Sequence, residues 1–103
     1  MNNIVFFHPS SLIETDNIDD DTKIGAFCII KPGVKIGKRC VIKDNVSIDG
    51  NVIIGDDVTI LSGTRVRGSV EIKNNVILNE NIVFTLHIDN KEELMTDKQT
   101  RIM

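Results

Sequence analysis

The sequence predicts an all-β fold, a parallel β-helix of about four coils, because one apolar series runs through almost the whole chain. Every sixth position holds a large apolar residue: Leu12, Ile18, Ile24, Ile30, Ile36, Ile42, Ile48, Ile54, Ile60, Val66, Ile72, Leu78 and Phe84. The residue two positions earlier is small or β-branched in nearly every repeat, and residues two apart share one side of a strand. Each repeat is therefore a short strand followed by a bend. Nothing recurs at 3.6 residues, which disfavours a helical fold.

The bends are marked by residues that tolerate a positive φ angle. Glycine directly follows the large apolar residue at positions 25, 37 and 55. A second set of turn residues falls further along the repeats: Gly33, Asn45, Asn51, Asp57, Gly63, Asn75 and Asn81. Glycine, asparagine and aspartate adopt this conformation at the least steric cost. We therefore expect a corner between each strand and the next.

Three repeats complete one coil, because only that offset gives neighbouring strands complementary charges. Residues one coil apart on parallel strands lie about 4.8 Å apart. An offset of 12 would stack Asp44 on Asp56, which is a like-charge pair. An offset of 18 gives three columns that alternate in sign: Asp20–Lys38–Asp56, Asp21–Arg39–Asp57 and Lys31–Asp49–Arg67. The cross-section is then a triangle.

We expect a single β-helix domain over residues 1–103, with the coils at about 7–88 and a tail at 89–103. Phe6 and Leu12 begin two of the inward columns, so we expect both to point into the core of the first coil.

The tail loses the six-residue pattern. Asp89 and Asn90 precede the acidic segment 91–95, which is typical of a helix N-cap and first turn. We favour a loop with a short helix or irregular structure here, although an extended arm packed on a neighbour fits equally well.

Composition limits the class of protein. The 103 residues carry 12 Lys and Arg against 15 Asp and Glu, a formal net charge of −3, so a basic nucleic-acid-binding face is not expected. The apolar run at the start ends at Phe7, too short for a signal peptide or a membrane span, and we expect a cytoplasmic protein. Cys28 and Cys40 are then buried free thiols. With only two histidines in the chain, no metal site is expected.

The repeats resemble the left-handed parallel β-helix of hexapeptide-repeat acyltransferases, and most closely the nucleotide-linked amino-sugar N-acetyltransferases of bacterial surface-polysaccharide pathways. The resemblance covers the N-terminal part of such enzymes. The segments that carry it are His8-Pro9-Ser10-Ser11, residues 22–28, residues 31–40, Asn45-Val46-Ser47-Ile48, residues 70–76 and Val83-Phe84-Thr85. The left hand is implied by this resemblance, since general topology rules favour a right-handed crossover.

The resemblance also implies a function. It implies a homotrimer with active sites between subunits, acetyl-CoA as cosubstrate, and a nucleotide sugar or other small acceptor. The acceptor would sit near the segment Phe84-Thr85-Leu86-His87, which makes Thr85 a candidate substrate-binding residue. The expected activity is acetyl transfer to an amino or hydroxyl group of a sugar, and the choice between the two groups stays open.

Individual residues can be matched to this chemistry. Acyl transfer needs a base, and His87 is our candidate because it falls where the repeat pattern ends, in an expected loop. Arg65 and Arg67 point outward on one strand and are candidates for phosphate binding. The candidates for binding sugar hydroxyl groups, which are equally typical of a structural corner, are Asn79, Glu80 and Asn81. Phe27, an aromatic residue at a corner, is expected to contact another subunit.

Two other functions were weighed. A non-catalytic trimerisation or scaffold module, derived from a truncated relative, would keep the coil without the enzyme. A carbonic anhydrase on the same fold would need three metal-binding histidines, and the chain has two, at positions 8 and 87.

Overall fold

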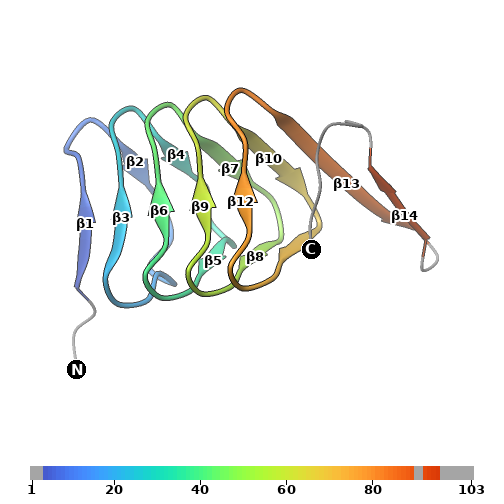
Figure 1. Cartoon of the computed structure of the whole chain (residues 1–103), viewed down its shortest axis with the longest axis horizontal. Helices are drawn as coiled ribbons and strands as arrows, with labels where there is room; N and C mark the ends of the chain where they lie inside the picture. Colours follow the sequence, from blue (N-terminus) through green and yellow to red (C-terminus); the bar gives the residue numbers. More distant parts are fainter. Residues whose placement is uncertain (1–3, 90–91, 96–103) are drawn as a thin grey trace.

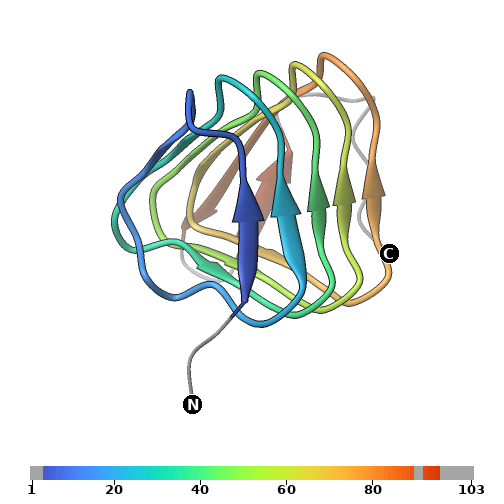
Figure 2. The same cartoon turned by 90° about the vertical axis from the view of Figure 1, so that its left-hand side faces the viewer.

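The computed structural model describes residues 4–89 and 92–95, with side chains described from Ile4 to Val83. The chain winds into about four coils stacked along one axis (Figure 1). Viewed from the N-terminal end, the chain turns counterclockwise as it recedes, so the coil is left-handed (Figure 2). No helix occurs in the described ranges, and hence none that could span a membrane. The parallel β-helix predicted from the repeats is confirmed.

The second, third and fourth coils each contribute one short strand to each of three faces, while the first coil reaches face C only through the isolated bridge of Ile18 to Ile36. Face A contains β1 (Val5–Phe7), β3 (Thr22–Ile24), β6 (Val41–Ile42), β9 (Thr59–Ile60) and β12 (Ile77–Leu78). Face B contains β2 (Leu12–Ile13), β4 (Ile29–Ile30), β7 (Ser47–Asp49), β10 (Arg65–Gly68) and β13 (Val83–Asp89), to which β14 (Glu92–Met95) is added. Face C contains β5 (Lys35–Ile36), β8 (Val52–Ile54) and β11 (Val70–Ile72). The neighbouring strands of each face run parallel, except for β13 and β14.

The core is formed by the inward side chains, which stack at intervals of 18 residues. On face B, Ile30 pairs with Ile48 and Ile48 with Val66, and all three are 0% exposed. On face C, Ile36 pairs with Ile54 at the same offset. The predicted three repeats per coil are therefore confirmed, and the apolar series fills the interior of the triangle.

The first coil is one residue shorter than the others, so the predicted inward positions of Phe6 and Leu12 are wrong. Here the strands pair at an offset of 17, with Phe7 opposite Ile24 and Ile13 opposite Ile30. A shift of one residue turns every side chain of a strand to the opposite face. Leu12 is accordingly 53% exposed, while Ile13 packs against the core.

The second set of predicted turn residues adopts the left-handed conformation at every position but one, whereas the expectation is wrong for Gly25, Gly37 and Gly55, which do not adopt it. The expected residues with positive φ are Gly33, Asn45, Asp57, Gly63, Asn75 and Asn81. At one corner the prediction is wrong, because Gly50, not Asn51, takes the positive φ. Gly50 stacks against Gly68 of the next coil, so closely that a Cβ at position 50 would lie 2.5 Å from the Gly68 carbonyl oxygen.

Among the described residues, the three predicted charge columns form one ion pair, between Arg39 and Asp57. Arg39 donates two hydrogen bonds to Asp57, from Nε at 2.8 Å and Nη2 at 2.9 Å, as its column predicts. Both side chains are exposed. The Arg39 guanidinium lowers the pKa of Asp57 below its ordinary value, and the carboxylate raises that of Arg39. Lys31 pairs with Glu14 of the first coil, at 3.2 Å, rather than with Asp49.

Regular structure continues through His87, where a loop was expected. Strand β13 continues to Asp89 and pairs antiparallel with β14, so the two strands form a hairpin. The helix predicted at residues 91–95 is therefore wrong over Glu92–Met95, and the rest of the tail lies outside the described residues. Strand β13 is already paired with β10 and offers its other edge to residues 92–95. Pairing with this strand satisfies backbone N–H and C=O groups that a short isolated helix would leave without hydrogen bonds.

Candidate functional site

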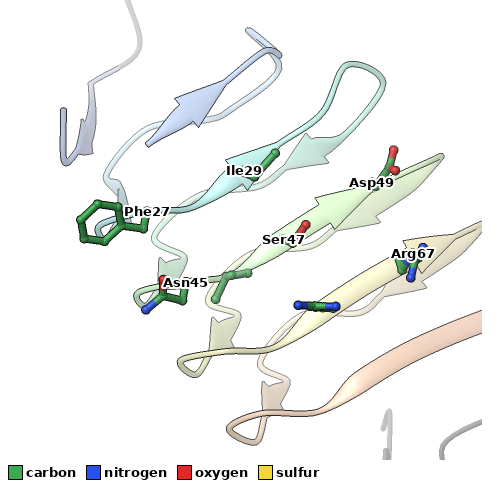
Figure 3. Close-up of a pocket in the computed structure, with 8 residues that line it drawn as sticks. Phe27, Ile29, Asn45, Ser47, Asp49 and Arg67 are labelled. Carbon is green, nitrogen blue, oxygen red and sulfur yellow. The ribbon is translucent and has the colours of Figure 1, made fainter. Parts of the chain in front are cut away.

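A groove with a cavity of about 400 Å³ lies on the outer side of face B (Figure 3). Its lining residues are Phe27, Ile29, Asn45, Val46, Ser47, Asp49, Arg65 and Arg67. They come from three successive coils, through β4, β7 and β10 and the corners that precede β4 and β7. Volumes of this size are typical of small-molecule sites in proteins.

Strand alternation and the 18-residue register place these side chains. Inward residues of β7 and β10 fill the core, so residues on either side of each must point outward. Ser47 lies opposite Arg65 on the neighbouring strand, and Asp49 lies opposite Arg67. Ile29 lies opposite Ser47 on the other side. The groove therefore has an apolar end on one coil, a polar centre on the next, and a basic end on the third.

The basic end is open to an anion. Within the part of the chain whose side chains are described, neither Arg65 nor Arg67 makes an ion pair within 4.0 Å. Among the residues with described side chains, Asp49 is the one carboxylate that lines the groove, against two guanidinium groups. The basic end of the groove is therefore positively charged, whereas the chain as a whole has a net charge of −3. Guanidinium groups bind phosphate oxygens well.

Phe27 forms the corner at the apolar end, in a conformation that suits it poorly. Its φ is 59°, and its side chain is 64% exposed. The equivalent corners of the following coils carry Asn45, Gly63 and Asn81, which accept this conformation readily. Its backbone N–H donates to Ser10 Oγ at 2.9 Å, and its ring lies 6.4 Å from that of His8.

His8 is held by the turn that opens the first coil. Its Nδ1 accepts a hydrogen bond from the Ser10 backbone N–H at 3.1 Å and lies 2.8 Å from Ser10 Oγ. The Nδ1 atom is therefore an acceptor, and the ring proton sits on Nε2. These contacts fix the corner on which Phe27 rests.

The corner predicted to bind sugar hydroxyl groups is placed at the start of β13 and does not line the groove. Asn79 accepts a hydrogen bond at its backbone oxygen from Thr64 Oγ1, at 2.6 Å. Asn81 takes φ 58°, and its backbone N–H donates to the Ser62 oxygen at 2.9 Å. Asn79 and Asn81 make these contacts through their backbones and Glu80 is exposed at the surface, so sugar binding by the three side chains stays a prediction.

Thr85 and His87 lie on β13. Thr85 pairs with Arg67 of β10, so the backbone of one candidate adjoins the basic end of the groove. His87 lies beyond the last pair of β10 and is opposite Leu94 of β14. The expected loop at His87 is thus a strand of the hairpin. The side chains of both residues lie outside those described, so their roles stay predictions.

The two cysteines are structural, as their burial shows. Cys28 and Cys40 are free and 0% exposed. The Cys28 thiol donates to the Lys43 oxygen at 2.9 Å, and that of Cys40 to the Gly55 oxygen at 3.1 Å. Burial raises the pKa of both thiols, which keeps them protonated and poorly nucleophilic. Residues 4–83 contain no cluster of three or more metal-ligating side chains.

Comparison with known families assigns part of the coil. Residues 17–50 match the family described as bacterial transferase hexapeptide (six repeats). The match covers 34 of the 103 residues, about a third of the chain. The hexapeptide segment begins directly before Ile18, where the offset changes from 17 to 18, and ends at Gly50, where the corner departs from the regular type. Neither curated proteins nor solved structures gave a match to the chain.

Sequence reasoning named the two arginines of the groove, stacked Asp49 on Arg67 and singled out Phe27 as a subunit contact, but it did not bring them together as one site. Ile29 and Ser47 had no pattern of their own, since outward positions of a strand vary freely. The signal that finds them is the register. Once residues 18 apart are neighbours, Ser47 and Asp49 must flank Arg65 and Arg67.

Proposed function

We propose that the protein is an acetyltransferase that uses acetyl-CoA and acts on an amino or hydroxyl group of a nucleotide-linked sugar. The observation that carries the proposal is the match to a transferase hexapeptide model, on a coil whose next turn presents two arginines in a groove, neither of them ion-paired among residues 4–83. The proposal includes a homotrimer and a place in cytoplasmic polysaccharide biosynthesis. These features follow from the family resemblance of the repeats.

The arginines support the substrate class. A nucleotide sugar and a coenzyme A thioester both carry a diphosphate, which bears negative charge at neutral pH. Arg65 and Arg67 are two residues apart on one strand and point to the same side, so both can reach one diphosphate. This binding would hold the acceptor against face B.

The transfer itself needs a base. A bond forms between the acceptor nitrogen or oxygen and the thioester carbonyl carbon, the carbon–sulfur bond breaks, and the acceptor's proton ends on the departing thiol. We assign the transfer of that proton to His87, because imidazole accepts and returns a proton near neutral pH. Its position on β13, the strand next to Arg67, is compatible with this role.

The direct test is thiol release. The full chain is mixed with acetyl-CoA and a panel of nucleoside-diphosphate amino and hydroxy sugars, and free coenzyme A is measured. His87→Asn should lower kcat about 100-fold, within the usual range for loss of a general base. Arg67→Gln should raise KM, and Lys73→Gln, which removes an exposed cation next to Glu71 away from the groove, should change neither constant. Absence of thiol release with every acceptor would contradict the proposal.

The scaffold function is the second candidate, and exposed apolar side chains favour it. Leu12 and Ile29 lie opposite each other on face B and are 53% and 42% exposed, next to Phe27 at 64%, and contiguous apolar surface commonly marks contacts between subunits. Sedimentation of the full chain as a trimer, without a thermal shift on addition of acetyl-CoA, would favour the scaffold over the enzyme.

A further inference from the structure

The groove on face B orders three kinds of chemistry along the axis of the coil. Phe27 and Ile29 supply an aromatic ring and an apolar side chain on one coil, Ser47 and Asp49 a hydroxyl and a carboxylate on the next, and the third coil carries the arginines. Figure 3 shows this sequence from the corner of Phe27 towards Arg67. Because successive parallel strands lie about 4.8 Å apart, the aromatic and basic ends are separated by about 10 Å.

We propose that this groove binds a nucleoside diphosphate, with the base on Phe27, the ribose over Ser47 and Asp49, and the phosphates on Arg65 and Arg67. This order of groups, aromatic, hydroxyl-rich and anionic, is that of the ligand itself. The inference deepens the proposed function by naming the ligand part that face B recognises. The inference rests on the proposed function only where it takes the group attached to the diphosphate to be a sugar.

The conformation of Phe27 supports a role in binding. A bulky residue at φ 59° costs stability, and the other corners of the same column avoid the cost with asparagine or glycine. The ring does not recover this energy by burial, since the residue is 64% exposed. An exposed aromatic face at the edge of a groove is suited to stacking on a nucleobase, which tolerates any base.

The polar centre fits the ribose. The Asp49 carboxylate accepts hydrogen bonds and can take those of the ribose hydroxyl groups, while the Ser47 hydroxyl can donate or accept. Asp49 would repel a phosphate placed on its own coil. The phosphates are therefore directed towards Arg65 and towards the side of Arg67 away from Asp49, one coil further along.

The experiment is a titration of the full chain with UDP and with ADP, followed by amide NMR shifts and calorimetry. Shifts should be concentrated at Phe27, Ser47 and Arg65. Uridine and inorganic pyrophosphate should each bind at least tenfold more weakly than UDP. CoA and a nucleoside-diphosphate sugar serve as competitors, and whichever displaces the bound nucleotide identifies the source of the ligand in the reaction.

Variants test both ends of the groove. Phe27→Asn removes the ring but introduces a residue that suits the corner, and it should weaken UDP binding about tenfold. The control Phe6→Ala, at an exposed phenylalanine of face A, should leave UDP binding unchanged. Arg65→Gln should weaken binding about tenfold, and Lys35→Gln on face C should have no effect.

Three results would overturn the inference: no binding of either nucleotide, shifts on another face, or pyrophosphate that binds as tightly as UDP with no effect of Phe27→Asn. Thiol release without nucleotide binding on face B would reject this inference and leave the proposed function standing. Nucleotide binding on face B without thiol release for any acceptor would support this inference and reject the proposed function.

Discussion

Phe27 is the residue at which the proposed nucleotide-binding role and the stability of the fold conflict most directly. Its left-handed backbone costs about 1 kcal/mol for a side chain of this size. Phe27→Asn should therefore raise the free energy of unfolding by about 1 kcal/mol, because asparagine already occupies the next corner of the column, Asn45. Urea unfolding measures the change. A loss of stability would mean that the ring contributes to packing and that the corner is not strained.

The Arg39–Asp57 pair gives a prediction for pH. The pKa of Asp57 is lowered in the folded state, so the pair contributes stability above the ordinary aspartate pKa, and this contribution is lost as the pH falls through the lower, folded-state value. In Arg39→Gln the pKa of Asp57 should return towards its ordinary value, as followed by carboxyl NMR titration. The stability difference from the natural chain should shrink below about pH 4. An unchanged titration would show that the two groups do not interact in solution.

At the scale of strands and corners, two glycines with positive φ differ in what surrounds them. A Cβ at Gly50 would lie 2.5 Å from the Gly68 oxygen, whereas at Gly33 its nearest contact would be 3.6 Å away. Gly33→Ala should cost about 1 kcal/mol, from the backbone conformation alone. Gly50→Ala should cost at least about 1 kcal/mol more, since backbone of the next coil must also move. Equal losses in urea unfolding would mean that the two coils are not in contact there.

The strands show which parts of the fold a sequence can and cannot reveal. The 18-residue register was readable because inward positions are apolar and stacked charges alternate. The slip in the first coil was not, because Phe6-Phe7 and Leu12-Ile13 are apolar pairs and satisfy the pattern in either phase. The hairpin at β13 and β14 was missed for a different reason. Its residues follow no repeat, and pairing with the edge of face B decides their conformation.

The candidate site divides in the same way. Arg65 and Arg67 could be named from their charge and their position on one strand. Their neighbours Ser47 and Asp49 required the register first, because exposed polar side chains carry no signal until one knows what lies beside them.

For the whole molecule, a coil depends on the coils on both sides of it, so stability should vary along the axis. Ile48→Ala should lower the free energy of unfolding by about 2–5 kcal/mol, because Ile48 is completely buried in a central coil. Ile13→Ala should lower the free energy of unfolding by about 1 kcal/mol or less, because Ile13 is only partly buried in the first coil. Urea unfolding of the two variants gives the comparison, and similar losses would indicate that the first coil is as firmly enclosed as the centre.

The placement of every groove residue depends on the winding of the chain, and nuclear Overhauser contacts between backbone protons measure that winding most directly. Contacts should join residues that are 18 apart, beginning with the pair Lys23 and Val41 and ending with the pair Val66 and Phe84. Between β1 and β3, the contacts should join residues that are 17 apart. Cross-strand contacts at offsets of 12 or 24, or the short-range pattern of a helix, would contradict the three-repeat coil and separate Phe27 from the arginines.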